Sequence, residues 1–287
     1  MKKFPTKIFC ISLLGFCMLK TQEVKTLVPY YYFPTKNNLE KESLNIGKNA
    51  YQLLYFGQIK EAINLAKLSV KINKSDEKLW LILSEAQMAN NLYDDALISL
   101  KNAQKINGNI SEIYFAKSNI YLKKSQLKQA KIEMEEGLKF EPNNDKAIFQ
   151  LGNIYIMEKD YSSAIKFFSK AIKIKTDFWQ AINNKGLAYF EQEKLNLSIE
   201  SFEKALIIEE NAEPLLGLAS CLRIKDINSA LVLAKKALDK DPNYVDYNYR
   251  KEQLWGDKLQ ASTEKLFKND ELHKYIKVAK LKIIESS

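Results

Sequence analysis

The sequence predicts an all-α protein, a right-handed α-solenoid of about six helix hairpins closed by a C-terminal capping helix. The first observation is an alanine that recurs every thirty-four residues, at Ala62, Ala96, Ala130 and Ala164. The second is the composition, because 46% hydrophobic residues with only 9 Gly and 6 Pro suit a well-packed helical chain. A helical period of this length is typical of hairpins that bury their apolar faces by stacking on their neighbours.

Other positions keep the same interval. Small residues recur where two helices would approach closely, at Ala50, Ser84, Ser118, Gly152 and Gly186. Between such positions, apolar residues follow the three- and four-residue spacing of helices with one buried face. The columns divide the solenoid, residues 43–244, into units at 43–76, 77–110, 111–144, 145–178, 179–211 and 212–244.

Residues 145–178 show the repeat most clearly. The positions that carry the repeat pattern are Leu151-Gly152, Tyr155, Ala164, Phe168 and Ala171. This pattern resembles the tetratricopeptide repeat (TPR), although its closing proline appears only at Pro142 and Pro242. The resemblance implies a helical solenoid that binds a protein or a peptide, and it does not identify the partner.

Residues 1–20 form a separate element. Lys2, Lys3 and Lys7 precede an apolar run from Ile8 to Leu19, which is too short to span a bilayer comfortably. This order predicts an export signal or a short membrane anchor. The protein is then exported or membrane-attached, in the periplasm or at a thylakoid or cell-envelope face. The alternative is a cytoplasmic protein in which this segment is a buried helix that caps the first repeat.

Residues 21–42 are expected to be extended. The stretch from Leu27 to Pro34 holds four adjacent aromatic residues between two prolines, and proline disfavours helix at and before its own position. We expect these aromatic side chains to pack on the first hairpin and to shield part of its groove.

Residues 245–287 are expected to form the capping helices. Trp255, Leu259 and Leu266 share one helical face, and a terminal repeat needs such an element to cover its apolar side. A last helix is expected from Asp270, its N-cap, with a basic amphipathic pattern that suits a solvated surface or an anionic membrane. The stretch 250–259, together with 27–30, resembles TPR proteins of cyanobacteria, some of which assist the assembly of photosynthetic membrane complexes.

The residue pattern predicts no catalytic residue, cofactor or metal site. Cys221 is isolated in the repeats, and the single histidine, His273, has no cysteine or carboxylate at metal-ligand spacing. The net charge of +9 is interleaved with acids along the helices, whereas a nucleic-acid site gathers lysine and arginine on one face. We therefore expect a protein or peptide partner and no nucleic acid.

The predicted binding site is the concave face, which the resemblance assigns to the first helix of each hairpin. Asn119 and Asn153 occupy one phase of adjacent repeats, and an amide can both donate to and accept from an extended peptide. The alternative is that these amides bond to neighbouring helices and that the nearby phenylalanines fill gaps between repeats. The candidate peptide-binding residues are Phe115, Asn119, Phe149, Asn153, Ile156, Asn183 and Phe190.

The sequence therefore predicts a non-catalytic adaptor or scaffold that binds a peptide or protein in its concave groove and assists assembly of a membrane-associated complex. The alternative is a structural subunit of a stable complex that uses its convex face and flanking helices. Peripheral membrane contact is expected through the N-terminal segment, and the oligomeric state stays open.

Overall fold

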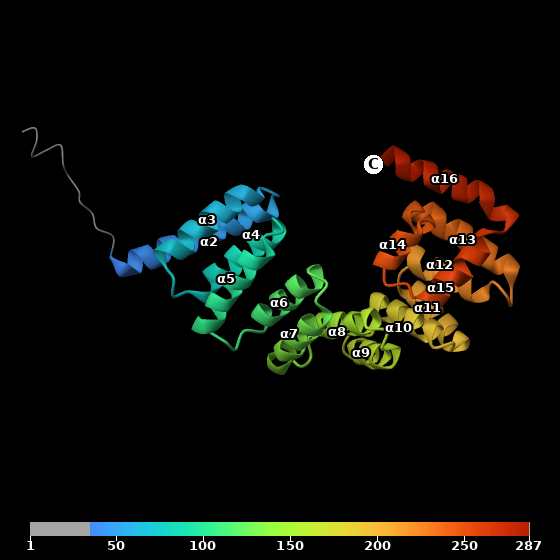
Figure 1. Cartoon of the computed structure of the whole chain (residues 1–287), viewed down its shortest axis with the longest axis horizontal. Coiled ribbons are helices and arrows are strands. Elements are labelled where there is room, and N and C mark those ends of the chain that lie inside the picture. Colours follow the sequence, from blue (N-terminus) through green and yellow to red (C-terminus); the bar gives the residue numbers. More distant parts are fainter. Residues whose placement is uncertain (1–34, 287) are drawn as a thin grey trace, which may run out of the picture.

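The computed structural model describes residues 35–286, in which fifteen α-helices and one 3-10 helix follow one another along an arc (Figure 1). This described part contains no β-strand. The all-α solenoid predicted from the thirty-four-residue period is confirmed. The expected export signal at 1–20 and the aromatic segment at 27–34 lie outside the described residues.

Six hairpins stack in chain order. The first three are α2 (Lys36–Tyr55) with α3 (Ile59–Ile72), α4 (Glu77–Ala89) with α5 (Tyr93–Ile106), and α6 (Ser111–Lys123) with α7 (Leu127–Phe140). The next three are α8 (Asp145–Met157) with α9 (Tyr161–Ile174), α10 (Trp179–Glu191) with α11 (Leu195–Ile208), and α12 (Ala212–Leu222) with α13 (Ile227–Lys240).

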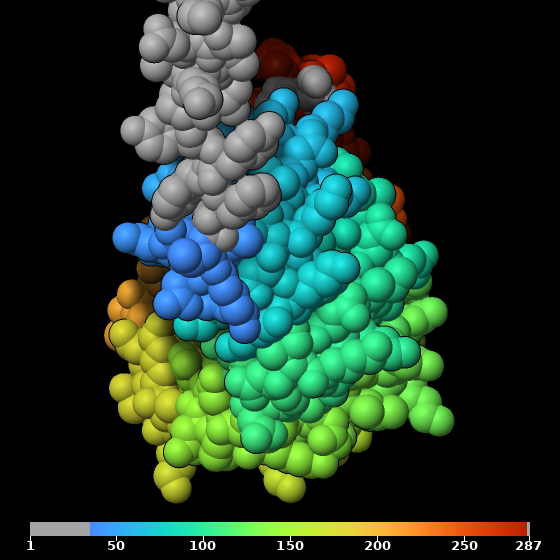
Figure 2. Space-filling model, turned by 90° about the vertical axis from the view of Figure 1, so that its left-hand side faces the viewer, coloured from blue at the N-terminus to red at the C-terminus, as the bar shows by residue number. Residues whose placement is uncertain are grey.

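The first helix begins earlier than the sequence suggested. The Thr35 side chain accepts a hydrogen bond from the backbone N–H of Asn38 and so caps α2. Residues 36–42, which we expected to be extended, are therefore helical. Figure 2 shows this end of the array, where α2 lies at the surface and the next hairpins follow it in chain order.

Each of the first five hairpins turns through one residue in the left-handed region. These residues are Gly57, Asn91, Ser125, Lys159 and Glu193, with φ between 57° and 74°, and they keep the thirty-four-residue step. Such a residue ends a helix because it lets the next N–H groups bond back to the last turn. The hairpin turn is thus set by backbone geometry at a fixed phase, and only Gly57 is a glycine.

The hairpins pack through small residues against aromatic rings. A Cβ on Gly152 would lie 2.5 Å from the ring of Phe168, which is fully buried between α8 and α9. Gly186 stands in the same relation to Phe202 one period later, at 3.0 Å, and Gly217 on α12 meets the same ring from the next hairpin at 2.7 Å. The small and bulky columns of the sequence therefore describe pairs of positions in direct contact.

The C-terminal element consists of η1 (Pro242–Val245), α14 (Tyr247–Glu252), α15 (Asp257–Phe267) and α16 (Asp270–Ser286). α15 packs on α10 and α12, and α16 packs on α13 and η1. Trp255, Leu259 and Leu266 are buried, as expected of a cap. The side chain of Asn269, not Asp270, accepts the first free N–H of α16, from Glu271.

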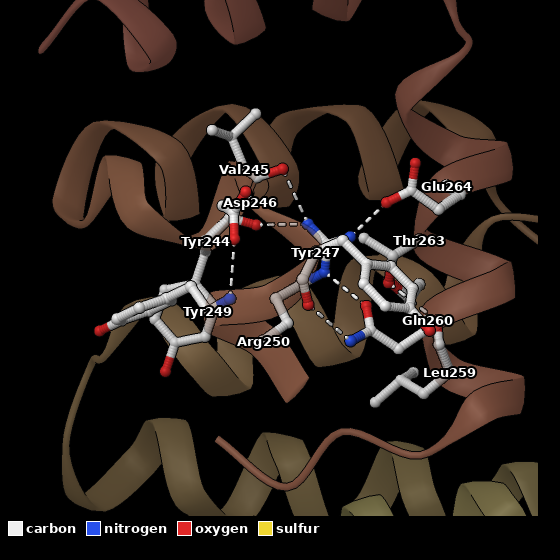
Figure 3. Close-up of polar contacts among 11 residues, drawn as sticks. Tyr244, Val245, Asp246, Tyr247, Tyr249, Arg250, Leu259, Gln260, Thr263 and Glu264 are labelled. Atoms are coloured by element: carbon white, nitrogen blue, oxygen red, sulfur yellow. Dashed lines mark hydrogen bonds and ion pairs between the residues drawn. The ribbon is translucent and has the colours of Figure 1, made fainter. Parts of the chain in front are cut away.

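A buried arginine holds this element together (Figure 3). Arg250 is fully buried, and its guanidinium donates to the carbonyls of Tyr244 and Val245 at 2.7 and 3.0 Å. It also donates to the Gln260 side chain at 2.8 Å and pairs with Glu264. η1, α14 and α15 are therefore joined by one side chain whose three nitrogens each donate to an acceptor.

Candidate functional site: the concave face

The concave face is open between the second and third hairpins. A hollow of about 420 Å³ lies between α4 and α6, and we call it the N-terminal hollow. Its lining residues are Leu81, Ser84, Glu85, Met88, Glu112, Phe115, Ala116 and Asn119. They recur every three or four positions on each helix, so both helices turn one stripe of their surface toward the same space.

Two of the predicted site residues lie in the N-terminal hollow. Asn119 is exposed, and its amide makes no hydrogen bond to any residue within 35–286. Phe115 is half-buried, and its ring lies 2.5 Å from where a Cβ on Gly137 would be. Phe115 therefore both fills the gap to α7 and forms a wall of the hollow, while Asn119 has its full hydrogen-bonding capacity available.

The N-terminal hollow also contains an acidic side chain that sequence reasoning did not select. Reduced hydration between the helices raises the pKa of Glu85 above its ordinary value. Glu85 forms no ion pair within the described part of the chain. Glu112 stands across the hollow on α6, so the rim of this space is acidic.

The C-terminal half of the concave face is partly covered by the chain itself, which leaves a hollow of about 460 Å³ lined by Phe149, Asn153 and Leu254 among others. Residues 252–259, which we call the return segment, run from the end of α14 into the first turn of α15. They cross α8, α10 and α12. Leu254 packs against the apolar core of the fourth and fifth hairpins. Trp255 is buried, and its indole Nε1 donates to the Glu213 carboxylate at 3.1 Å.

A second carboxylate holds the start of α15. Glu191, at the end of α10, accepts from the backbone N–H groups of Lys258 and Leu259 at 3.2 and 2.9 Å. Free N–H groups at a helix N-terminus favour a negative charge, so Glu191 acts as a cap supplied by another hairpin. Lys159 pairs with Asp257 at 2.7 Å and adds a contact from the fourth hairpin.

Burial shifts the titration of both carboxylates. It raises the pKa of Glu213 to about 7, an effect that hydrogen bonds from Trp255, Asn183 and Tyr244 partly oppose. Burial also raises the pKa of Glu191, against the two backbone hydrogen bonds from α15. The return segment is therefore held by acids whose charged form is disfavoured where they lie.

The remaining predicted residues lie in or beside the partly covered half. Asn153 accepts from the Asn184 side chain at 2.9 Å, and Phe149 packs between the rings of Phe168 and Phe178. Asn183 and Ile156 are buried, and Phe190 packs against the core that includes the return segment. Ile156 lines a small pocket together with Leu254 and Trp255 of the return segment. The part of Ile156, Asn183 and Phe190 in peptide binding stays a prediction.

Within 35–286, no group of three or more His, Cys, Asp or Glu side chains is placed to hold a metal ion. Cys221 is buried in the sixth hairpin, and burial raises the pKa of its thiol to about 12. Its thiolate is therefore not formed at neutral pH. No helix in this range is long and apolar enough to cross a membrane.

The fold and the concave face define a helical-repeat protein whose first helices form an inner surface. The family model for the tetratricopeptide repeat matches residues 111–144, 145–178 and 180–211. The chain therefore contains tetratricopeptide repeats within an α-solenoid. None of the curated proteins compared with the chain matches it.

Solved structures share this fold. A tetratricopeptide repeat protein from Parabacteroides merdae is 15% identical, with a TM-score of 0.63 over 83% of this chain and 99% of its own. MamA protein is 22% identical, with a TM-score of 0.54 over 66% of this chain and 96% of its own. YrrB, described as a TPR protein with an unusual peptide-binding site, is 17% identical, with a TM-score of 0.51 over 63% and 90%.

Proposed function

We propose that this protein is a non-catalytic scaffold that binds an extended segment of another protein in the N-terminal hollow. The observation that supports the proposal is the unused amide of Asn119 beside the apolar side chains of Leu81, Met88 and Phe115. An amide that can donate and accept, next to apolar walls, suits a peptide with bulky side chains.

The return segment supports the same proposal by its chemistry. It places an aliphatic and an aromatic side chain, Leu254 and Trp255, against first helices of the solenoid. The Glu191 carboxylate on α10 accepts hydrogen bonds from its backbone N–H groups at Lys258 and Leu259. The inner surface of this solenoid thus accommodates non-repeat chain through apolar side chains and hydrogen bonds to its backbone.

The acidic rim restricts the kind of peptide that the N-terminal hollow would bind. Glu85 has no cation beside it, and Glu112 lies across the same hollow. A basic residue next to the bulky apolar side chains of the bound peptide could pair with the exposed Glu85 carboxylate. The proposed ligand is therefore an extended peptide with aliphatic or aromatic residues and at least one lysine or arginine.

We propose a cellular role for this binding from the sequence of residues 1–20. An export signal or membrane anchor would bring the scaffold to a membrane face, where it would assist assembly of a protein complex. YrrB, which shares the fold, is described as having an unusual peptide-binding site, and this description makes peptide capture by a similar array a reasonable model.

The test starts from a random peptide library selected on the full protein. A selected peptide should slow hydrogen exchange in α4 and α6. Asn119→Ala should weaken binding of this peptide by about three- to tenfold, since one hydrogen bond contributes about 0.5–1.5 kcal/mol. Asn228→Ala, at an exposed position on α13, is the matched control. Selected peptides that protect other helices, or that bind Asn119→Ala unchanged, would contradict the proposal.

A further inference from the structure

A second groove lies on the other side of the fifth hairpin. A space of about 360 Å³ runs between α9 and α11, with α10 at its floor. Ile172, Ile182, Leu197 and Ile207 contribute apolar walls, and the side chain of Ile207 is 84% exposed. No residue of the N-terminal hollow or of the return segment lines this groove.

One cation in this groove lies beside an aromatic ring and forms no ion pair among the described residues. The Lys185 ammonium is 5.5 Å from the centre of the Tyr189 ring. Lys185 is half-buried on α10, and no carboxylate within residues 35–286 lies within 4 Å of its ammonium. The nearest acid on α11, Glu200, is paired with Lys204 at 2.7 Å. Loss of hydration, followed by repulsion from Lys204, lowers the pKa of Lys185, and attraction by Glu200 partly opposes this shift. The groove thus holds a partly desolvated positive charge among aliphatic side chains.

The repeat itself supplies an internal comparison. Lys117 occupies the position of Lys185 two periods earlier in the chain. The ammonium of Lys117 donates to the Gln104 side chain at 2.6 Å and lies 3.7 Å from the Glu133 carboxylate. Two periods later in the chain, Ile172 stands at the position of Gln104, and Ser201 stands at the position of Glu133.

The fifth hairpin therefore keeps the lysine and lacks both of its acceptors. The Ser201 hydroxyl does not compensate, because it donates to the Leu197 carbonyl on its own helix. The Tyr189 ring attracts the Lys185 ammonium but carries no full negative charge, so this partly hydrated cation is stabilised further when a carboxylate reaches it. The exposed side chains of Leu197 and Ile207 beside it favour a ligand with apolar side chains.

We infer that this outer groove binds a protein segment that carries a carboxylate between bulky aliphatic side chains. The carboxylate would take the place that Glu133 has beside Lys117, and the aliphatic side chains would cover Ile172 and Ile207. This inference is independent of the function proposed for the N-terminal hollow, whose acidic rim favours a basic peptide. The two surfaces would then bind segments of opposite charge.

The probe is a synthetic ten-residue peptide, capped at both ends, with one glutamate between pairs of leucines, beside versions with glutamine or lysine at that place. Fluorescence anisotropy on the full protein should give a dissociation constant at least tenfold lower for the glutamate peptide. Lys185→Gln should remove this preference, and Lys117→Gln, at the paired lysine, should keep it. No measurable binding, or equal binding of the glutamate and glutamine peptides, would overturn the inference.

Ser201→Glu restores the acceptor that the third hairpin has. The new carboxylate should pair with Lys185, weaken the glutamate peptide at least tenfold, and leave the melting temperature equal or higher, so that loss of binding is not loss of fold. Unchanged binding by Ser201→Glu contradicts the inference. Decanoate that binds while the glutamate peptide does not, or self-association that Lys185→Gln abolishes, would assign the groove to a fatty acid or to a second copy instead.

Discussion

The indole of Trp255 donates a hydrogen bond to the carboxylate of Glu213 inside the protein, at 3.1 Å. This pair joins the return segment to the first helix of the sixth hairpin, across forty-two positions of sequence. Both side chains are buried, with Trp255 4% and Glu213 9% exposed, so the contact excludes water on both sides. The C-terminal element is therefore attached to the concave face by a polar contact inside an apolar interface.

Glu213 makes the stability of the protein depend on pH. Burial raises its pKa from 4.5 to about 7, so the folded protein binds a proton more readily than the unfolded chain. Stability should therefore fall as pH rises from 4.5 to about 7 and then level off, a loss of about 3 kcal/mol from this group.

Glu213→Gln should flatten this part of the pH profile and raise stability at pH 8. Urea unfolding between pH 5 and 8 measures the effect, with Glu209→Gln at an exposed position as the control. Glu191, whose pKa is also raised by burial, keeps part of the slope in both variants. Identical slopes in Glu213→Gln and the parent protein would show that Glu213 does not titrate in this range.

Gly256 should not tolerate a side chain. A Cβ at this position would lie 2.2 Å from the Glu191 side chain, although the backbone at φ −78° accepts any residue. Gly256→Ala should displace the carboxylate that caps α15 and destabilise the protein by about 1–3 kcal/mol. Thermal unfolding measures the loss. Gly108→Ala is the matched control, because its nearest neighbour is a carbonyl oxygen at 3.4 Å.

Arg250 should not be replaceable by lysine. Lysine has no planar fork to reach Gln260, Glu264 and the carbonyls of η1 together, so buried acceptors would lose their donors. Arg250→Lys should cost about 3 kcal/mol, a value reduced by the half-exposed Glu264. Chemical denaturation with Arg223→Lys as the control checks it, since Arg223 makes a single hydrogen bond, to Ser262. Equal midpoints for the two variants would contradict this prediction.

The turn position of each hairpin gives a prediction on backbone strain alone. Gly57 has φ +74°, and a Cβ there would meet no atom within 4 Å. Gly57→Ala should therefore destabilise by about 1 kcal/mol through the left-handed conformation only. Ser125, at φ 57° two periods later, gives the reciprocal experiment, since Ser125→Gly should be neutral or stabilising. A melting temperature that rises in Gly57→Ala would refute the argument.

The repeat part of the fold is readable in the sequence because each helix contacts only near neighbours. Ala164, Gly152 and Phe168 report local packing that recurs every thirty-four residues, so their spacing is sufficient to place the hairpins. The start of α2 was missed because Thr35, its cap, follows a proline-rich aromatic stretch that indicated extended chain.

The site was less predictable because part of it is covered by residues far away in sequence. Glu191 and Glu213 lie sixty-eight and forty-two positions from the atoms they hold, and no periodic signal links them. Asn153 and Asn119 share one phase of the repeat, yet Asn153 bonds to Asn184 and Asn119 is free of such a neighbour. Phase alone could not distinguish them.

The return segment also changes how the array can deform. In a simple repeat array each hairpin touches only the next one, so bending is distributed along the whole length like the extension of a spring. Here the Lys159–Asp257 contact and the packing of α15 on α10 and α12 join the fourth, fifth and sixth hairpins across the inside of the curve. We expect these contacts to make that half stiffer than the rest. Changes of curvature should then be concentrated in the first three hairpins, and the N-terminal hollow should open or narrow as the arc bends.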